Sequence, residues 1–500
     1  MPLAVDLLAQ GFTNALSPEN LFYAFAGSLI GTLVGVLPGI GPTAGLAILM
    51  PLTVFLSPSS AIIMMAAVYY GALYGGSTTA IVVNIPGEAA SVPTALDGYQ
   101  LARQGRAGAT LGISAIASFV AGTLGLVGLT FFTPPLARVA LRFGPPEYFA
   151  LVVLSMSLVI GLSGSSLAKG LVSACLGLLA GTIGLDPISG TARLTFGSPT
   201  LTAGLHFVAI VIGLFAFSEV FINVERSVAY LYETRLIGWL PTRQDLRDCR
   251  GAILRASGVG FFLGLLPGFS PAVTTFLAYD LERRVSPNAA RFGKGAIEGV
   301  AAAEGANNAA SSGSFVPLFA FGIPSCAPIA VLMGAFMMYG LQPGPRLLTE
   351  QPALVWTIIA SMYVGNAMLL VLNLPLVGLW AQVARIPFRI LGPVIVVSSV
   401  VGAYSLRFQT FDVWVALLFG VVGYLLRKTG VPVAPLVLAS VLVETLETSL
   451  RLSLILSNGS PYIFFRRPIS AVIMIAALAL FARSVWTRGR QPARGTLDEG

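Results

Sequence analysis

The chain has 500 residues, of which 56% are apolar and only 10% are charged, and its formal net charge is +8. Ordinary globular proteins carry about 25% charged residues, so this composition excludes a soluble protein and predicts an all-α integral membrane protein that sits in the lipid bilayer. The basic residues lie in short segments between apolar runs, as in the cytoplasmic loops of membrane proteins. This distribution argues against nucleic acid as a partner.

In chain order, the apolar runs predict about 10–12 transmembrane helices. Some of the runs are long enough to span a bilayer, and others are shorter or interrupted. The long runs lie at 21–37, 107–132, 147–163, 167–184, 201–223, 353–383, 386–406, 411–426 and 468–486. The shorter runs lie at 43–56, 60–85, 252–267, 271–281, 296–320 and 325–341.

The longest hydrophilic stretch, 224–255, contains six arginines and divides the chain near its middle. We therefore expect a first repeat half at 1–223, a basic cytoplasmic linker at 224–255, a second repeat half at 256–486 and a polar C-terminal tail at 487–500. The orientation of the last helix stays open, because arginines flank both of its ends.

The two halves share an internal repeat. Residues 31–43 read GTLVGVLPGIGPT and residues 260–272 read GFFLGLLPGFSPA. Each copy continues through a Ser-Pro turn to a stretch of small residues, at 69–87 and 307–325, that ends in Ile-Pro and a further small residue. Three landmarks in the same order predict a duplication. Interrupted segments at matching places in two halves indicate the central binding site of a transporter.

Charge predicts that the two repeats are inverted. The loop 282–294 contains three arginines and one lysine, whereas its counterpart in the first copy, 56–60, contains no charged residue. Because basic loops stay in the cytoplasm, we expect the two loops to face opposite sides of the membrane.

Each copy contains a Leu-Pro-Gly break, at 37–39 and at 266–268. Proline lacks a backbone N–H and blocks the preceding helical turn, and glycine frees the backbone, so both sites end a helix within an apolar region. We expect a re-entrant or broken hairpin at each site, because the freed backbone groups need protein or water as partners. A tight turn at the membrane surface is the alternative.

Small and polar residues surround these breaks and offer hydroxyl, amide and backbone donors to a carboxylate. A half-helix N-terminus adds a partial positive charge that favours anions. The alternative is helix packing, in which Gly, Ser, Thr and Asn are common. The candidate substrate-binding residues are Pro38, Gly39, Gly41, Ser77, Thr78, Thr79, Asn84, Pro267, Gly268, Ser270, Asn307, Asn308, Ser311 and Ser312.

Glu304 and Asn308 are the candidates for ion coupling, because they lie four residues apart and share one face of a helix. A charge inside the membrane is costly and is therefore a functional candidate. Glu304 is expected to bind a cation, to carry a proton or to pair with Lys294. Glu88 and Asp97, by contrast, are expected in a solvent-exposed loop.

The signatures of soluble enzymes are missing. The sequence contains no Walker A pattern, no GxSxG elbow and no HExxH, and its three cysteines and single histidine show no metal-ligand spacing. We expect no enzyme activity, no bound metal and no cofactor, apart from transported Na⁺ or H⁺.

Long strings in both repeats resemble the large membrane subunit of the tripartite tricarboxylate transporters. The first copy carries GTLVGVLPGIGPTAGLAILMPLT and YYGALYGGSTTAIVVNIPGEAASVPTALDGYQLARQGRAG. The second carries LPGFSPAVTTFLAYDLERRVS, FGKGAIEGVAAAEGANNAASSGSFVPLFAFGIPS and GLQPGPRLL, and GNAMLLVLNLPLVGLW and LETSLRLSLILSNGS follow. The resemblance covers roughly residues 15–480, nearly the whole chain.

The resemblance implies a multi-pass protein of the bacterial inner membrane. It implies uptake of tri- and dicarboxylates, citrate-like, driven by an ion gradient, together with a small integral-membrane subunit and a periplasmic substrate-binding protein as partners. One departure from the family pattern is that Ser325 and Cys326 follow the second Ile-Pro.

Three other functions remain as alternatives. The first is a stand-alone cation-coupled organic-anion carrier that works without a binding protein. The second is an intramembrane enzyme, which would need a nucleophile and base or an acid cluster at membrane depth. The third is a channel, which two asymmetric broken repeats favour less than alternating access.

Overall fold

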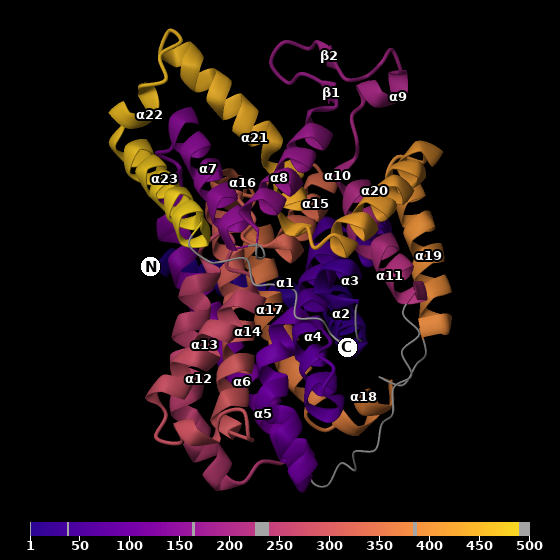
Figure 1. Cartoon of the computed structure of the whole chain (residues 1–500), viewed down its shortest axis with the longest axis vertical. Coiled ribbons are helices and arrows are strands. Elements are labelled where there is room, and N and C mark those ends of the chain that lie inside the picture. The colour runs from indigo at the N-terminus through magenta and orange to yellow at the C-terminus, as the bar shows by residue number, and fades with distance from the viewer. Residues whose placement is uncertain (1, 38–39, 163–165, 226–239, 384–387, 490–500) are drawn as a thin grey trace. The chain divides into compact units, whose positions relative to one another are not determined.

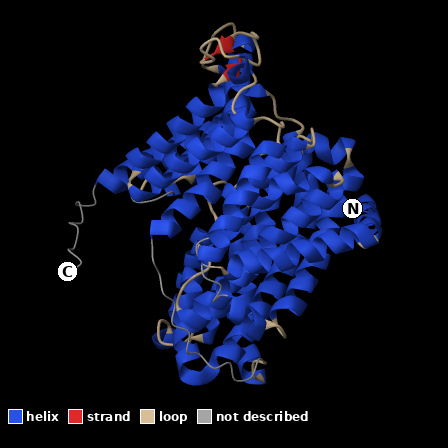
Figure 2. Ribbon diagram, turned by 90° about the vertical axis from the view of Figure 1, so that its right-hand side faces the viewer, coloured by secondary structure: helices blue, strands red, loops and turns tan. Residues whose placement is uncertain are grey.

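The structure is a computed structural model that describes residues 2–37, 40–162, 166–225, 240–383 and 388–489. Within these ranges the chain is built of helices, and its two short strands form one hairpin (Figures 1 and 2). The expected all-α fold is confirmed. Parts of the predicted linker, 226–239, and of the tail, 490–500, lie outside the described residues.

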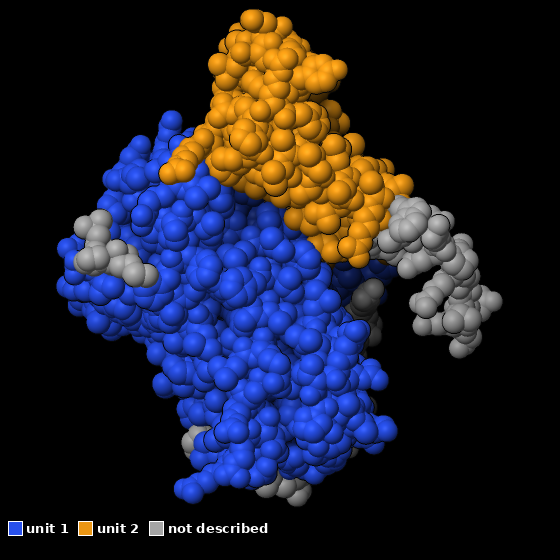
Figure 3. All heavy atoms as spheres, turned by 90° about the vertical axis from the view of Figure 1, so that its left-hand side faces the viewer, with its two compact units in different colours: residues 1–141, 208–424 blue, residues 142–207, 425–500 orange. Residues whose placement is uncertain are grey.

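The chain forms two compact units, which Figure 3 distinguishes by colour. Unit 1 contains residues 1–141 and 208–424, and unit 2 contains residues 142–207 and 425–500. Each unit therefore combines segments from both sides of the basic stretch at 224–255. The division into two repeat halves stays a prediction from the sequence. The two compact units do not test it, because each unit contains helices from both predicted halves.

Unit 1 holds most of the helices, including both Leu-Pro-Gly breaks. Its α-helices are α1 (Pro2–Ala15), α2 (Pro18–Val36), α3 (Gly41–Leu49), α4 (Pro58–Val83), α5 (Val92–Leu101), α6 (Ala107–Ala140), α10 (Phe207–Val211), α11 (Ser218–Glu225), α12 (Arg243–Gly264), α13 (Pro271–Val285), α14 (Ile297–Phe321), α15 (Ala327–Met338), α16 (Pro345–Glu350), α17 (Pro352–Asn373), α18 (Val377–Val383), α19 (Phe388–Ser405) and α20 (Thr410–Lys428), whose last turn belongs to unit 2. Short 3-10 or π segments join them: η1 (Met50–Phe55), η2 (Ala89–Ser91), η3 (Ala102–Arg106), η4 (Ile212–Phe217) and η5 (Ala289–Arg291).

Local sequence explains where several of these helices begin. The Ser-Pro pairs at 17–18 and 57–58 place a capping hydroxyl before a proline in the first turn, which needs no N–H there. Ser57 accepts a hydrogen bond from the backbone N–H of Ser60 at the start of α4. At α12, the Thr242 hydroxyl and the Asp245 carboxylate form a reciprocal capping box.

Glycines let the central helices of unit 1 pack backbone to backbone. A Cβ at Gly31 or Gly35 of α2 would come within 2.4 or 2.1 Å of the carbonyl oxygen of Val68 or Ala72 in α4. At the matching repeat positions of α12, a Cβ at Gly260 or Gly264 would come within 2.6 or 2.4 Å of the carbonyl oxygen of Ala306 or Ala310 in α14. Equivalent glycines of the two copies thus serve the same kind of helix contact.

Both predicted breaks end a helix. α2 stops at Val36 before α3 begins, and α12 stops at Gly264 before α13 begins. Gly268 takes a φ of 90°, a conformation that favours glycine, and its N–H donates to the Ser325 carbonyl at 2.8 Å. The break after α12 is therefore bonded to the Ile-Pro segment that follows α14.

Unit 2 is a group of four long helices that carries a hairpin at one end. Gly177 and Gly181 of α8 pack against backbone carbonyls of Leu436 and Ser440 in α21, so these two helices run parallel. The elements of unit 2 are α7 (Pro145–Leu162), α8 (Leu167–Thr182), β1 (Gly184–Leu185), β2 (Ala192–Arg193), α9 (Pro199–Thr202), α21 (Ala434–Leu456), α22 (Ile463–Arg466) and α23 (Pro468–Gly489).

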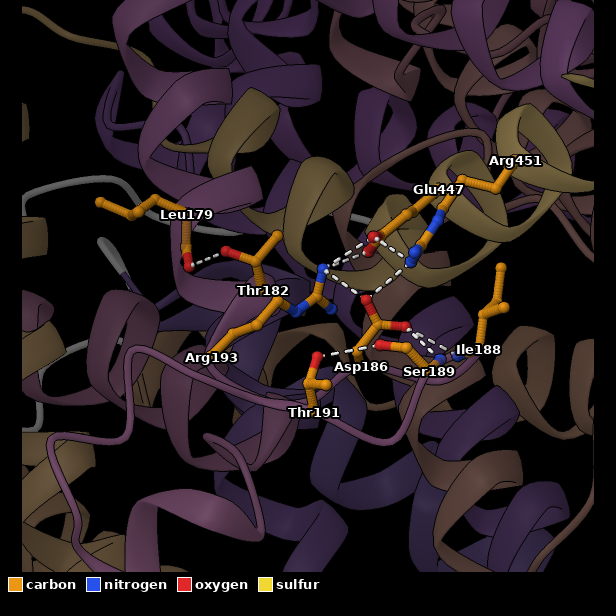
Figure 4. Close-up of polar contacts among 9 residues, drawn as sticks. All are labelled: Leu179, Thr182, Asp186, Ile188, Ser189, Thr191, Arg193, Glu447 and Arg451. Carbon is orange, nitrogen blue, oxygen red and sulfur yellow. Dashed lines mark hydrogen bonds and ion pairs between the residues drawn. The ribbon is translucent and has the colours of Figure 1, made fainter. Parts of the chain in front are cut away.

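Four charged side chains fasten the β1–β2 hairpin to α21 (Figure 4). Arg193 of the hairpin bonds both oxygens of Glu447, at 2.7 and 2.9 Å. Arg451 bonds Asp186 at 2.6 Å and Glu447 at 3.1 Å. Hydrogen bonds from Ser189 N–H, from Arg451 and from Ile188 N–H hold the pKa of Asp186 well below its usual value.

Seven of the described helical segments are long and apolar enough to cross a membrane, by length and composition. Four shorter apolar helices accompany them. The long segments are Pro18–Val36, Ala89–Ala140, Pro145–Leu162, Phe207–Glu225, Pro352–Asn373, Thr410–Lys428 and Pro468–Val485. The chain is therefore a multi-pass membrane protein.

Candidate functional site

Helix α4 is buried along most of its length in unit 1. Its glycines allow this: a Cβ at Gly71 or Gly75 would come within 2.7 or 2.3 Å of a carbonyl oxygen of α2. The predicted site residues Ser77, Thr78 and Thr79 lie in its last turns and are buried. The small-residue stretch therefore places hydroxyl groups inside the unit, where no lipid reaches them.

Helix α14 presents a polar face that is buried from end to end. Glu304, Asn307, Asn308, Ser311 and Ser312 follow the spacing i, i+3, i+4, i+7, i+8, which puts all of them on one side of a helix. All five side chains are buried. Asn308 Nδ2 bonds the Glu304 carbonyl at 3.2 Å, while Asn308 Oδ1 has no hydrogen-bond partner among the described residues.

Glu304 joins α14 to the polar end of α4. Its carboxylate accepts a hydrogen bond from Ser77 Oγ at 3.0 Å and a second, short one from Thr94 Oγ1 of α5. Within the described residues Glu304 has hydroxyl partners and no ion pair with Lys294, which was one of its three possible roles. Neutral hydroxyl donors, not a lysine, hold this carboxylate.

Tyrosines of α4 add further links that the sequence analysis missed. Tyr70 Oη lies 3.1 Å from Ser312 Oγ of α14. Tyr74 O–H donates to Asn366 Oδ1 of α17 at 2.7 Å, and Asn366 Nδ2 donates to Thr123 Oγ1 of α6 at 3.0 Å. The sequence does contain a signal for these links. Tyr70, the second residue of a Tyr-Tyr pair, and Tyr74 lie one helical turn apart within an apolar stretch.

Glu88 is a second carboxylate at this site. It follows the first Ile-Pro, is partly buried, and its Oε1 accepts a hydrogen bond from Asn307 Nδ2 at 3.1 Å. Asp97 is fully buried in α5, so the expectation that it lies exposed in a loop is wrong. It accepts bonds from the N–H groups of Gly295 and Ala296, at 2.8 and 2.9 Å, and so caps the start of α14.

The remaining predicted residues lie at helix ends. Asn84 caps α4 with a φ of 58° and is exposed, which is a structural role for a residue that tolerates the left-handed region. Gly41 begins α3 with a φ of 63°. Ser270, which follows Pro267 and Gly268, is the N-cap residue of α13. Pro38 and Gly39 lie outside the described residues.

Apolar helices that can cross a membrane, together with buried helices lined by Ser, Thr, Asn and Glu, define a multi-pass membrane protein with a polar interior, as transporters have. Comparison with known families gives the particular family. Residues 21–438 match the tripartite tricarboxylate transporter TctA family, so the chain belongs to this family. It is a family of transporters, and its members are the large membrane subunits of tripartite systems.

Two curated relatives come from Agrobacterium vitis. One is an uncharacterized 52.8 kDa protein in the TAR-I ttuC' 3' region, 46% identical over 476 residues, which cover 95% of each chain. The other is an uncharacterized protein in the TAR-II ttuC' 3' region, 46% identical over 215 residues, which cover 43% of this chain and 89% of that protein. No solved structure matches this chain significantly.

Proposed function

We propose that the chain is the large permease subunit of a binding-protein-dependent, ion-gradient-driven secondary transporter that takes up tri- and dicarboxylates such as citrate. Membership of the TctA family supports the transporter class. The partners in this proposal are a small integral-membrane subunit and a periplasmic substrate-binding protein. The site of action is the bacterial inner membrane.

The observation that carries the proposal is the buried polar face of α14 opposite the polar end of α4. Ser77 of α4 bonds Glu304 of α14, and Tyr70 contacts Ser312, so the two small-residue stretches meet inside unit 1. Polar groups within a membrane protein are costly and mark substrate or ion pathways. Hydroxyl and amide donors of these stretches match the acceptor oxygens of a carboxylate.

The substrate-binding set in this proposal has three parts. The first comprises Ser77, Thr78 and Thr79 of α4. The second comprises Asn307, Asn308, Ser311 and Ser312 of α14. The third comprises the two breaks and their flanking turns: Pro38, Gly39, Gly41, Asn84, Pro267, Gly268 and Ser270.

Uptake of radiolabelled citrate by cells that produce the chain with its small subunit and binding protein tests this assignment. Thr78→Ala and Asn307→Ala are expected to lower uptake at least tenfold, because each removes a buried polar group from the site. Thr110→Ala is the matched control: its hydroxyl is also buried, but its hydrogen bond within the described residues goes to the carbonyl of Arg106, four positions earlier. Normal uptake in both site variants, with normal membrane levels, would refute the placement.

Reconstitution separates the proposed system from a stand-alone carrier. Proteoliposomes that contain the large and small subunits should accumulate citrate only when the binding protein is supplied and an ion gradient is imposed. Equal uptake by this chain alone would favour the stand-alone cation-coupled carrier. Uptake without any gradient dependence would favour a channel.

A further inference from the structure

Two carboxylates lie in one buried region of unit 1 without a basic partner among the described residues. Glu304 accepts hydrogen bonds from Ser77 and Thr94, and Glu88 accepts one from Asn307. Asn307 follows Glu304 by three positions, so their side chains are neighbours on α14. Neutral donors alone do not balance the charge of an ionised carboxylate.

The same region holds oxygen atoms that lack a hydrogen-bond donor. Asn307 is fully buried, and its Oδ1 has no partner within the described residues. Its Nδ2 donates to Glu88 Oε1, so the amide oxygen is the side-chain atom of Asn307 that lacks a partner. The unpartnered Oδ1 therefore belongs to the same amide group whose nitrogen binds the Glu88 carboxylate.

Ser91 supplies a second such oxygen. Its Oγ is buried without a partner among the described residues. A Cβ added to Gly76 of α4 would come within 2.9 Å of both Ser91 Oγ and Glu88 Cγ. Ser91 and Glu88 thus pack against the same face of α4, and only a glycine leaves room for them there.

A single bound cation would compensate the carboxylates and the unpartnered oxygens together. A buried ionised carboxylate is costly unless a positive charge compensates it, and a buried acceptor that lacks a donor also destabilises the folded protein. A proton satisfies one acceptor, whereas a hard cation binds several oxygens at once. Because Ca²⁺ takes about 6–8 oxygens and Mg²⁺ keeps several waters, this smaller set, whose carboxylates already accept protein donors, suits a monovalent alkali cation.

We infer that Glu88, Ser91, Glu304 and Asn307 form a Na⁺ site between α4, the 88–94 segment and α14. The inference deepens the proposed function and rests on it for one consequence, that this ion couples to carboxylate uptake. The site combines residues that directly follow the first small-residue stretch with the polar face of α14. A bound Na⁺ would therefore hold the two repeat copies together and lower the repulsion between the site and an anionic substrate.

Binding of ²²Na⁺ to the purified full-length protein, without substrate or partner subunits, tests the site. Saturable binding is expected for the wild type in a choline chloride background, with a higher thermal unfolding temperature in NaCl than in choline chloride. Glu88→Gln and Glu304→Gln are expected to weaken ²²Na⁺ binding at least tenfold. Unlabelled Na⁺ should displace the tracer, and Ca²⁺ should not.

Glu298→Gln is the matched control. Glu298 is another buried glutamate of α14, bonded by Asn288, about 9 Å along the helix from Glu304. This variant should bind ²²Na⁺ as the wild type does. A monodisperse elution profile and an unchanged unfolding temperature in choline chloride show that the other variants are folded.

Three results would overturn the inference: no saturable ²²Na⁺ binding by the wild type, undiminished binding by both Glu88→Gln and Glu304→Gln, or displacement by Ca²⁺ alone. The failure of the proposed function has a different signature. If ²²Na⁺ binds as described but the assembled system takes up no carboxylate, the substrate assignment fails and the cation site stands.

Discussion

At the scale of single residues, the hydrogen-bond partners in the structure show the roles of two acidic side chains, Asp97 and Glu88. Asp97 is an intramolecular cap for α14, and Glu88 is part of the polar region around Asn307. In the sequence both stand among Gly, Ala and Pro near two arginines, which is typical of a loop. Their partners cannot be found from the sequence, because those lie about two hundred positions further along the chain.

Asp186 gives a pH prediction outside the membrane-spanning segments. Its pKa is lowered by Ser189 N–H, by Arg451 and by Ile188 N–H. A depressed carboxyl pKa contributes stability above its unfolded value, about 3.9, and loses it only as the pH falls through the lower folded value. Amide exchange at Ile188 and Ser189, corrected for intrinsic rates, should therefore show constant protection from pH 8 to pH 5.

Asp186→Ala should abolish this protection at every pH, because both amides lose their acceptor. Asp280→Ala, which removes an exposed acid paired with Arg284, should leave it unchanged. A loss of protection in the wild type between pH 7 and pH 5 would contradict the prediction.

At the scale of elements, helix contact through glycine organises unit 1. α2 meets α4, and α12 meets α14, at glycines that occupy matching positions of the repeat. In the sequence these glycines are landmarks of the duplication. The sequence does not pair each glycine with its carbonyl, since small residues fit many helix surfaces equally well.

Two glycines of α12, two positions apart, provide a matched test of this packing. Gly260→Ala places a methyl group 2.6 Å from the Ala306 carbonyl oxygen, so the helices must separate, and a loss of about 1–3 kcal/mol is expected. Gly258→Ala meets no atom within 4 Å and should be neutral or stabilising by up to about 1 kcal/mol. Thermal unfolding in detergent measures the change in stability for each variant. Equal effects of the two substitutions would show that the contact with α14 does not restrict residue size at Gly260.

At the scale of the whole molecule, charge sets an expected orientation. The span Phe207–Glu225 has one arginine in the 183–206 segment before it and six in the 224–255 stretch after it. The positive-inside rule therefore predicts that the hairpin lies outside the cytoplasm. Within unit 2 the hairpin is fastened near the C-terminal end of α21, so α23 is expected to run back toward the cytoplasm.

Cysteine labelling tests this topology in a background in which Cys175, Cys249 and Cys326 are replaced by alanine. Phe196→Cys, at a side chain that is 88% exposed, should react with a membrane-impermeant maleimide in intact spheroplasts. Arg247→Cys, at an exposed position of α12, should react only after permeabilisation. The reverse pattern would invert the proposed orientation.

By itself, the sequence determined that the protein lies in lipid and is helical. It also determined the two Leu-Pro-Gly breaks and the residues of the two small-residue stretches. These features are local, because composition, apolar length and the backbone limits of proline and glycine act within a few residues. Only the tertiary structure decided that Glu88 meets Asn307, that Thr94 meets Glu304, and that unit 2 draws its helices from distant segments. Such partners are selected by packing and by the need to satisfy buried polar groups, and neither leaves a periodic trace in the sequence.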